Sequence, residues 1–387
     1  MIYTGGLFFM SSCHKFFNLL ILLLKLTCRI ILLLILILVS IRLPYLYAQD
    51  TSKQQSPQID QNKPKESTPA ATPSLSEALN QSIIFIYEDK TPPNTIPDKV
   101  LVGEVLGTAF IIGIPVEGNP NLSFPVVVTA KHVITGQTKV LGRYNSKSGN
   151  ETIYAPYNLE DLRKSNDLWE HPKDKDLDIV AFRTVVYDNT ILAPIPIDLL
   201  ATEETFLNEY IDVADRVVIP CLMADFPGAK QNYPIYRDGS IALVNKEPIS
   251  YPMKMGDQIV IVKDQRVIFV NSILNEGFSG APVFLWPSFR PTPKGPQLGG
   301  KLWLIGIVQG FFPIRREILY EDGIPVILNK PIDENITTST QMKVYSQENS
   351  ATGIVFPSWR IFEILKSDPV NKRIKQLSDQ VSKSPNK

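Results

Sequence analysis

The segment GFSGAPV at residues 277–283 places a serine inside a tight, glycine-flanked turn that leads into an apolar strand. Glycines on both sides let the backbone fold closely around Ser279. The same backbone allows the amides of Gly277 and Ser279 to point at one spot, as the oxyanion hole of an acyl-transfer enzyme requires. An ordinary glycine turn is the alternative interpretation of this segment taken alone.

Two upstream segments supply a histidine and a carboxylate, each at the end of a predicted strand. In VVTAKHV, residues 127–133, an apolar strand ends at a small residue and then presents His132. In DIVAF, residues 178–182, Asp178 directly precedes an apolar strand, with Asp176 as the alternative carboxylate. A half-buried carboxylate can hold an imidazole in one tautomer and orientation. A lone histidine is more often a core or surface residue, so the hypothesis depends on all three segments together.

The composition favours a β-rich fold. The chain has 387 residues with 31 prolines, which break helix interiors, and 39 Lys and Arg balance 39 Asp and Glu. Zero net charge argues against an electrostatic nucleic-acid binder. Many short runs rich in β-branched and aromatic residues predict a sandwich or barrel. These runs are Ile83–Tyr87, Val100–Ile112, Phe124–Thr129, Ile179–Val186, Arg216–Leu222, Ser240–Val244, Gln258–Val262, Val267–Val270, Pro282–Leu285, Leu302–Val308 and Gly353–Phe356.

The N-terminal residues 1–48 read as a signal peptide or an N-terminal membrane anchor. They contain basic residues and no acidic ones, and the uninterrupted apolar run Ile30–Ile41 is shorter than the roughly 20 residues needed to span a bilayer. Cleavage before Gln49 and an uncleaved anchor over residues 17–41, which would contact the membrane, both stay open. Either reading predicts an extracytoplasmic protein, periplasmic or secreted after cleavage, or anchored to the membrane.

The remaining boundaries follow from changes in composition. Residues 49–74 are rich in Gln, Ser, Thr and Pro and predict a disordered linker. A folded domain is expected over residues 75–367, closing with a helix at 358–367, and residues 368–387 are expected to be a polar, frayed tail. Within the domain, residues 145–176 and 313–350 are expected to be surface insertions.

Taken together, the motifs resemble the trypsin/chymotrypsin-like serine peptidase family in its disulfide-free bacterial form. The order His132, Asp178, Ser279 matches the chymotrypsin type and differs from subtilisin and from α/β-hydrolases. The resemblance covers roughly residues 80–366. It rests on GTAF at 107–110, VVTAKHV at 127–133, DIVAF at 178–182, GFSGAPV at 277–283, LIGIVQG at 304–310 and GIVFPSWRIFEIL at 353–365.

This resemblance implies an all-β fold of two antiparallel six-stranded β-barrels (trypsin-like) with a short C-terminal helix. It implies that His132 and Asp178 come from the first barrel and Ser279 from the second, with the site between them. The implied catalytic residues are His132, Asp178 and Ser279, and the implied oxyanion-hole donors are the amides of Gly277 and Ser279. No metal and no cofactor is expected.

The sequence departs from the family around the substrate site. Phe278 stands before the serine, where the family usually has Asp or Asn, and its ring can pack under the oxyanion turn or distort it. Ile273 occupies the base of the primary specificity pocket and argues for a small or apolar side chain before the cut. Gln309, Gly310 and Phe311 fall where the family flanks that pocket and pairs with the substrate backbone.

Two residues outside the motifs are expected to be structural. His171 lies in a predicted loop and is expected to be solvated rather than catalytic, and Cys221 reads as a small buried hydrophobe. With so few histidines and no paired cysteines, a zinc site is not expected.

The leading functional hypothesis is a serine endopeptidase of the cell envelope or the exterior, acting on a protein or peptide substrate. A second hypothesis, motivated by Phe278, is a catalytically inactive trypsin-like domain that binds a peptide or envelope protein partner. A third is an unrelated β-rich envelope binding domain, which predicts that His132, Asp178 and Ser279 lie far apart.

Overall fold

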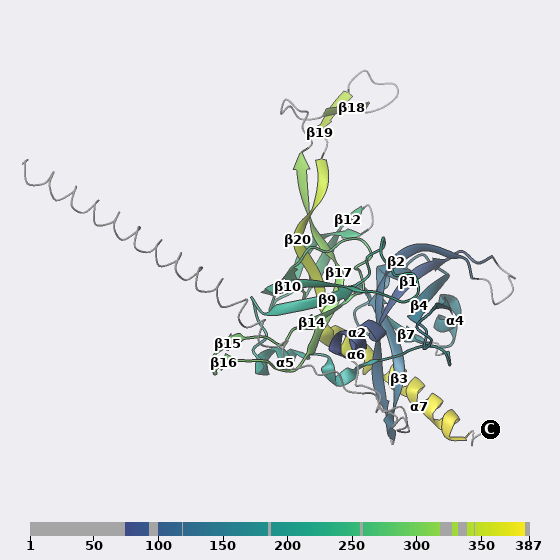
Figure 1. The fold of residues 1–387 in the computed structure, drawn as a ribbon. Helices are drawn as coiled ribbons and strands as arrows, with labels where there is room; N and C mark the ends of the chain where they lie inside the picture. The colour runs from purple at the N-terminus through teal and green to yellow at the C-terminus, as the bar shows by residue number, and fades with distance from the viewer. Residues whose placement is uncertain are drawn as a thin grey trace, which may run out of the picture. The chain divides into compact units, whose positions relative to one another are not determined.

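The structure is a computed structural model that describes residues 74–92, 100–117, 119–184, 187–255, 258–317, 327–331, 339–343 and 345–383 (Figure 1). The chain divides into two units, Met1–Ala71 and Thr72–Lys387, and every described residue belongs to the second. The predicted signal peptide or anchor over residues 1–48, and all but the last residue of the predicted linker 49–74, lie outside the described residues. Among the helices that the structure describes, none is long and apolar enough to cross a membrane.

The first half of the folded unit is an eight-stranded sheet. Its hydrogen-bonded path runs β5-β4-β1-β2-β3-β7-β6, and β8 pairs in parallel with β2. The strands are β1 (Ile83–Asp89), β2 (Val102–Val116), β3 (Asn119–Ala130), β4 (Lys139–Asn145), β5 (Thr152–Asn158), β6 (Leu168–Glu170), β7 (Ile179–Arg183) and β8 (Ile195–Pro196). The expected six-stranded barrel is therefore an eight-stranded sheet here, in which β6 and β8 contribute only three and two residues.

The second half is a closed barrel of six strands, as predicted. The strands close in the order β10-β13-β20-β17-β14-β9. They are β9 (Arg216–Cys221), β10 (Ile235–Val244), β13 (Ile268–Asn271), β14 (Pro282–Leu285), β17 (Trp303–Glu317) and β20 (Tyr345–Pro357). Closure leaves no unpaired strand edge, which an open sheet would have to protect.

Three two-stranded hairpins are added to the second half. They are β11 (Ile249–Met255) with β12 (Gln258–Gln265), β15 (Arg290–Thr292) with β16 (Gly295–Gln297), and β18 (Ile327–Pro331) with β19 (Ser339–Lys343). The first hairpin packs against β17 and places Tyr251 and Met253 in the hydrophobic core.

Two regions predicted to be surface insertions contain regular structure. The region 145–176 holds β5, helix α4 (Leu159–Lys164) and β6, and the two strands extend the first sheet. Short, weakly alternating strands such as β6 become stable only through the neighbours with which they pair, so the local pattern did not reveal them. The region 313–350 holds the outer parts of β17 and β20, which pair as far as Glu317 and Tyr345.

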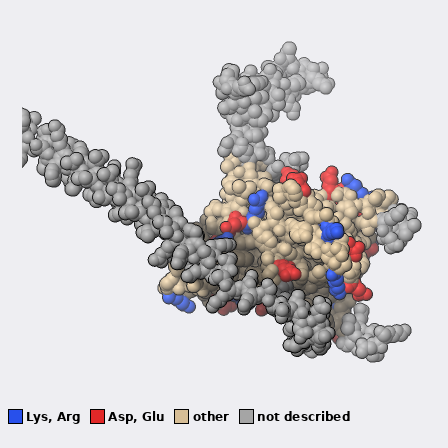
Figure 2. Space-filling model, viewed as in Figure 1, with Lys and Arg blue, Asp and Glu red and all other residues tan. Residues whose placement is uncertain are grey.

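The remaining helices are short, apart from the last. They are α2 (Leu75–Ser82), α3 (Lys131–Ile134), the 3-10 turn η1 (Ile197–Leu199), α5 (Glu203–Asn208), α6 (Ser358–Leu365) and α7 (Asp368–Lys383). Helix α6 confirms the predicted short C-terminal helix, and its buried residues include Trp359, Ile361 and Leu365. On the face shown in Figure 2, basic and acidic side chains are scattered singly among other residues, with no large patch of either sign.

One hydrophobic core cluster spans both halves. It joins Phe110 and Ile179 of the first sheet to Leu304 and Phe356 of the barrel, all of them at most 1% exposed. Burial of such side chains stabilises the fold by about 1.5–3 kcal/mol each. The two halves are therefore held together by shared apolar packing, which fixes the position of the loops between them.

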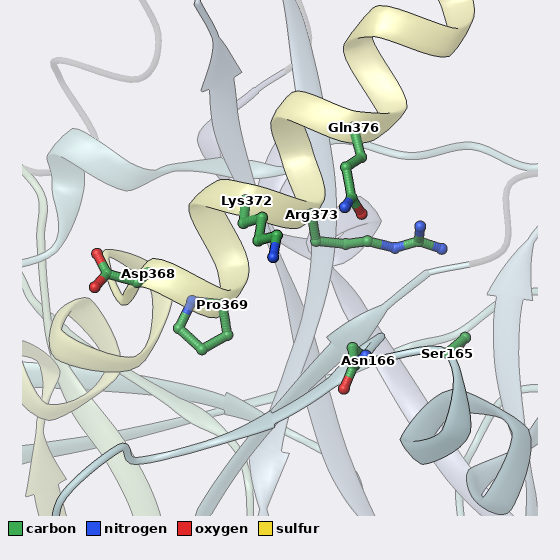
Figure 3. A pocket seen from close by; sticks show the side chains of 7 residues that line it. All are labelled: Ser165, Asn166, Asp368, Pro369, Lys372, Arg373 and Gln376. Atoms are coloured by element: carbon green, nitrogen blue, oxygen red, sulfur yellow. The ribbon is translucent and has the colours of Figure 1, made fainter.

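Helix α7 replaces the expected frayed tail. Val370 and Ile374 lie one helical turn apart and are both buried in the core cluster that spans the two halves. The side chain of Arg373 reaches from α7 across a surface pocket of about 410 Å³ whose other wall includes Ser165 and Asn166 (Figure 3). Two apolar residues in a polar segment predict a helix only weakly. Here they dock α7 on the core because Arg373 also finds an oppositely charged side chain to pair with.

That partner is Asp167, whose side chain is fully buried. Arg373 donates two hydrogen bonds to its carboxylate, at 2.6 and 3.0 Å, and Ser165 donates a third at 2.9 Å. Arg183 Nε lies 3.4 Å from Asp167 Oδ2. Burial alone would raise the pKa of Asp167, but the hydrogen bonds from Arg373 and Ser165 and the charges of Arg183 and Arg373 lower it below its usual value.

We expect Asp167→Asn to lower the free energy of unfolding by about 2 kcal/mol at neutral pH, because hydrogen bonds to a charged group are lost. A lowered folded-state pKa contributes stability above the unfolded-state pKa, and that contribution disappears as the pH falls through the folded-state pKa. The difference between wild type and variant should therefore shrink in acid. Urea unfolding at several pH values measures it, with the exposed Asp161→Asn in α4 as control. If Asp167→Asn lowered the free energy of unfolding equally at all pH values, the stabilisation would not come from the ionised Asp167 carboxylate.

Candidate active site

Strand pairing brings His132 beside Asp178. Strand β3 ends at Ala130, which is opposite Ile179 at the start of β7 in the antiparallel register. His132 lies in the single helical turn α3 that follows β3, and Asp178 directly precedes β7. The amide of Lys131 also donates to the Asp178 carbonyl at 3.2 Å, which fixes the two strand ends together.

The Asp178 carboxylate holds His132 through both of its oxygens. The His132 backbone amide donates to Oδ1 at 2.7 Å, and His132 Nδ1 lies 2.6 Å from Oδ2. This pairing fixes the proton on Nδ1 and leaves Nε2 as the nitrogen that can accept a proton. The alternative carboxylate, Asp176, is exposed to solvent.

The turn around Ser279 is fastened to the first half by Thr108 of β2. The Thr108 amide donates to the Ser279 carbonyl at 2.9 Å, and its hydroxyl donates to the Gly277 carbonyl at 2.8 Å. The same hydroxyl accepts from the amide of Leu222, which follows β9 in the barrel. Thr108 is fully buried, so these bonds are shielded from water.

Gly107 brings the histidine and serine segments into contact. A Cβ atom at Gly107 would lie 2.8 Å from a methyl group of Val133 and 2.9 Å from the Ser279 carbonyl oxygen. Val133 is the residue after His132, so the two segments approach β2 at the same point. The absence of a side chain at Gly107 is what permits both approaches.

The Ser279 hydroxyl points to Gln309 in this structure. Its Oγ donates to the Gln309 carbonyl at 3.1 Å, and among the described residues no hydrogen bond joins it to His132. Gln309 is the extra residue of a β-bulge between Val308 and Gly310 of β17, and bulges often re-aim groups beside active sites. Catalytic hydrogen bonds are commonly loose before substrate binds, and rotation about the Ser279 side-chain bond would redirect the hydroxyl.

Two amides in the turn are free to donate. Phe278 N donates to the Asn275 carbonyl and Gly280 N to the Val308 carbonyl, whereas neither Gly277 N nor Ser279 N has an acceptor among the described residues. Gly277 has φ of +88° and Gly280 has φ of +84°, which glycine adopts without strain. The two unbonded amides are those named as oxyanion-hole donors from the sequence.

The Phe278 ring is buried. The side chain is 1% exposed and belongs to the core of the barrel together with Leu274 and Ala281. The Arg237 guanidinium carbon lies 5.6 Å from the ring centroid, a cation–π distance. Phe278 is thus an apolar anchor for the residues on either side of it.

The residues predicted to bind substrate differ in accessibility. Ile273 is 54% exposed, and Gly310 and Phe311 are partly exposed. Gln309 is fully buried, and neither polar atom of its side chain has a hydrogen-bond partner among the described residues. Its backbone carbonyl accepts the hydrogen bond from the Ser279 hydroxyl.

His171 is buried, not solvated as predicted. Its side chain is 6% exposed, and Nε2 lies 2.8 Å from Glu363 of α6. Nδ1 accepts hydrogen bonds from the amides of Lys173 and Asp174, and Asp174 also pairs with Arg360 of α6. The loop preceding Asp178 is therefore clamped to α6, and the local sequence gave no sign of a partner 192 residues away.

One further residue at the site, Thr108, was not predicted from the sequence. Its position directly after Gly107 in the segment GTAF is the signal that could have found it.

We expect Gly280→Ala to lower the free energy of unfolding by about 3 kcal/mol or more, because overpacking adds to backbone strain. Its Cβ would lie 2.1 Å from the Thr108 carbonyl oxygen and 2.3 Å from Thr129 Oγ1. Gly136→Ala is the matched control, because Gly136 also has a positive φ, +81°, but no atom lies within 4 Å of the position that its Cβ would take. We expect this variant to lower the free energy of unfolding by only about 1 kcal/mol. Denaturant unfolding measures both, and equal losses would show that the turn is not tightly docked.

Comparison with known proteins finds similarity to solved structures. No family model and no curated protein matches the chain. Among solved structures, the apo form of the MamO protease domain from Magnetospirillum magneticum has a TM-score of 0.36 and 11% identity, over 74% of this chain and 97% of that one. The HtrA-type protease AlgW with decapeptide has a TM-score of 0.35 and 12% identity, over 73% of this chain and 63% of that one.

The active form of the Rv3671c protease from M. tuberculosis has a TM-score of 0.35 and 16% identity, over 78% of this chain and 92% of that one. By their names all three are proteases or protease domains, and AlgW is an HtrA-type protease.

Proposed function

We propose that the chain is a serine endopeptidase in which His132, Asp178 and Ser279 form the catalytic triad. The observation that carries this proposal is the double hydrogen bond between His132 and Asp178, which leaves Nε2 as the proton acceptor. The docking of the Ser279 turn on the same part of β2 supports it. The two unbonded amides in that turn supply the remaining element of acyl-transfer chemistry.

The mechanism follows from these groups. The Ser279 hydroxyl, turned from the Gln309 carbonyl toward His132, attacks the peptide carbonyl carbon while Nε2 accepts its proton. Asp178 stabilises the imidazolium, and the amides of Gly277 and Ser279 bind the oxyanion, each worth roughly 2.7–4 kcal/mol to the transition state. His132 then donates the proton to the leaving amine, and water hydrolyses the acyl-enzyme by the same steps.

A second function is favoured by one observation. Because the Ser279 hydroxyl donates to Gln309 and not to His132, the same fold can act as a catalytically inactive domain that binds a peptide or an envelope protein partner. In that case the serine is never activated. Reactivity of the serine toward a mechanism-based probe separates the two functions.

Labelling with a fluorophosphonate tests the triad. We expect the full chain to be labelled, Ser279→Ala to lose all labelling, and His132→Ala to react at least about 10³-fold more slowly, because the hydroxyl loses its base. Ser148→Ala, in an exposed loop, is the control and should label like wild type. Absence of labelling in the wild-type chain would favour the inactive binding domain.

The primary specificity is proposed from Ile273. An apolar side chain at this position offers no charge for a Lys or Arg substrate, so we expect cleavage after small or apolar residues. Profiling a peptide library with the full chain, and with Ser279→Ala to identify background cleavage, measures this preference. Cleavage confined to sites after Lys or Arg would overturn it.

Export of the protein is proposed from the sequence alone. Ile30–Ile41 would be the apolar region of a cleaved signal peptide, or residues 17–41 an uncleaved anchor, and either would place the peptidase outside the cytoplasm. N-terminal sequencing of the chain recovered from producing cells separates cleavage before Gln49 from a retained anchor.

A further inference from the structure

Arg143 of β4 is a buried arginine whose charge is not paired with a carboxylate. The residue is 2% exposed, and among the described residues no acidic side chain lies within 4 Å of its guanidinium. Its Nη1 donates to the Pro227 carbonyl at 2.6 Å, and Nη2 donates to the Gly228 carbonyl. A buried charge is costly in free energy, and neutral carbonyl groups offset that cost less fully than a carboxylate would. Stability alone therefore does not explain an arginine at this position.

The two carbonyls belong to the β9–β10 loop, residues 222–234, which connects two strands of the barrel. The same loop is held a second time through Asn232, which is also 2% exposed. The Asn232 backbone amide donates to Asn145 Oδ1 at 2.6 Å, and its side-chain amide donates to the Arg143 carbonyl at 2.7 Å. A loop of the second half is thus fastened to β4 of the first half by both the side chain and the backbone of Arg143.

The start of this loop touches the serine turn. The Leu222 amide donates to the Thr108 hydroxyl at 3.0 Å, and that hydroxyl donates to the Gly277 carbonyl at 2.8 Å. A Cβ atom at Gly277 would lie 3.7 Å from the Leu222 carbonyl oxygen and 3.9 Å from its Cδ2, which is van der Waals contact. The Gly277 amide is one of the two proposed oxyanion donors, so a shift of Leu222 would displace it.

Strand register places Arg143 and Thr108 on the same face of the first sheet. Phe85 of β1 lies opposite Arg143 of β4 on one side and opposite Thr108 of β2 on the other. Residues directly opposite each other in antiparallel strands share a face of the sheet. The loop is therefore bound at its start by Thr108 and in its middle by Arg143, two points of one rigid element. A loop bound at its start alone could pivot about that point.

We propose that Arg143 is a positioning residue for the oxyanion hole: by holding the β9–β10 loop on β4, it keeps Leu222 against Gly277 and the amides of the serine turn aimed at the reacting carbonyl. This proposal rests on the proposed peptidase function and deepens it. Arg143 acts through the loop and not on the substrate. The hydrogen bonds between His132 and Asp178 involve neither the loop nor Arg143, so the two parts of the site should respond separately.

Arg143→Met tests the proposal in the full chain, because it removes the donors and keeps an unbranched side chain. We expect the rate of fluorophosphonate labelling of Ser279 to fall roughly tenfold, less than the roughly 10²–10³-fold loss on removing an oxyanion donor outright. The NMR resonance of the His132 Nδ1 proton should stay unchanged, because its bond to Asp178 is intact. A labelling rate equal to that of wild type, or a shifted resonance, would overturn the proposal.

Gly228→Ala tests the same link from the loop side. Gly228 has φ of +86°, and a Cβ atom there would clash with the Gln231 carbonyl oxygen, so the variant moves a carbonyl that Arg143 binds and leaves β4 intact. If Arg143 acts through the loop, each single variant and the double variant should be labelled at similar rates, because the changes affect one link. A double variant whose loss is the product of the single losses would contradict the proposal. Gly228→Ala also gives a rate that decides the question if Arg143→Met does not fold.

Arg290→Met is the matched control for removing a buried arginine. Arg290 is 4% exposed and donates to Asp215 at 3.2 Å and to Gln297 at 3.0 Å. Asp215 directly precedes β9, whereas the β9–β10 loop follows the other end of that strand. We expect Arg290→Met to lower the melting temperature without changing the labelling rate, and an equal fall in labelling for both arginine variants would show a general loss of stability instead of positioning.

Hydrogen exchange supplies a readout that does not depend on activity. The amides of Leu222 and Thr108 are hydrogen-bonded at the junction of the loop and the serine turn, so they should exchange roughly tenfold faster in Arg143→Met than in Arg290→Met. Equal exchange in the two variants would overturn the proposal. If the wild-type chain is not labelled at all, the peptidase proposal fails, whereas these exchange rates still decide whether Arg143 holds the loop against the turn.

Discussion

The site depends most on the hydrogen bonds made by one buried threonine. Thr108 belongs to the first half, yet its amide and hydroxyl bind the carbonyls on either side of Phe278, and its hydroxyl also accepts from Leu222. Its own carbonyl accepts from Thr129. Because Thr108 is fully buried, each of these bonds would be costly to lose, so the serine turn has one position relative to β2 and to the histidine.

The Asp178 carboxylate is held in place in a similar way by residues from several elements. The loop before Asp178 is clamped to α6 through His171 and Asp174, and Lys131 on the other side pairs with Glu170 at 2.9 Å. A group that must hold an imidazole in one orientation gains from such support, since small displacements of catalytic groups are costly.

The local sequence was sufficient for much of the fold. Apolar strands such as β3 and β7, the closing strand β20 and the amphipathic helix α6 were predicted because their own side chains determine which face is buried. The strands β5 and β6 and the helix α7 were not predicted as regular structure. Each depends on partners far away in the chain, as Val370 and Arg373 depend on the core and on Asp167.

The sequence by itself determined the order of the histidine, carboxylate and serine segments, and the glycines that allow a tight turn around Ser279. These are properties of residue type and spacing, which need no knowledge of contacts. Only the tertiary structure decided that Asp178 and not Asp176 faces His132, that the Phe278 ring is buried in the barrel core, and that the Gln309 carbonyl accepts the hydrogen bond of the Ser279 hydroxyl. Those outcomes depend on strand register and on packing between the two halves, where groups distant in sequence compete for the same buried space.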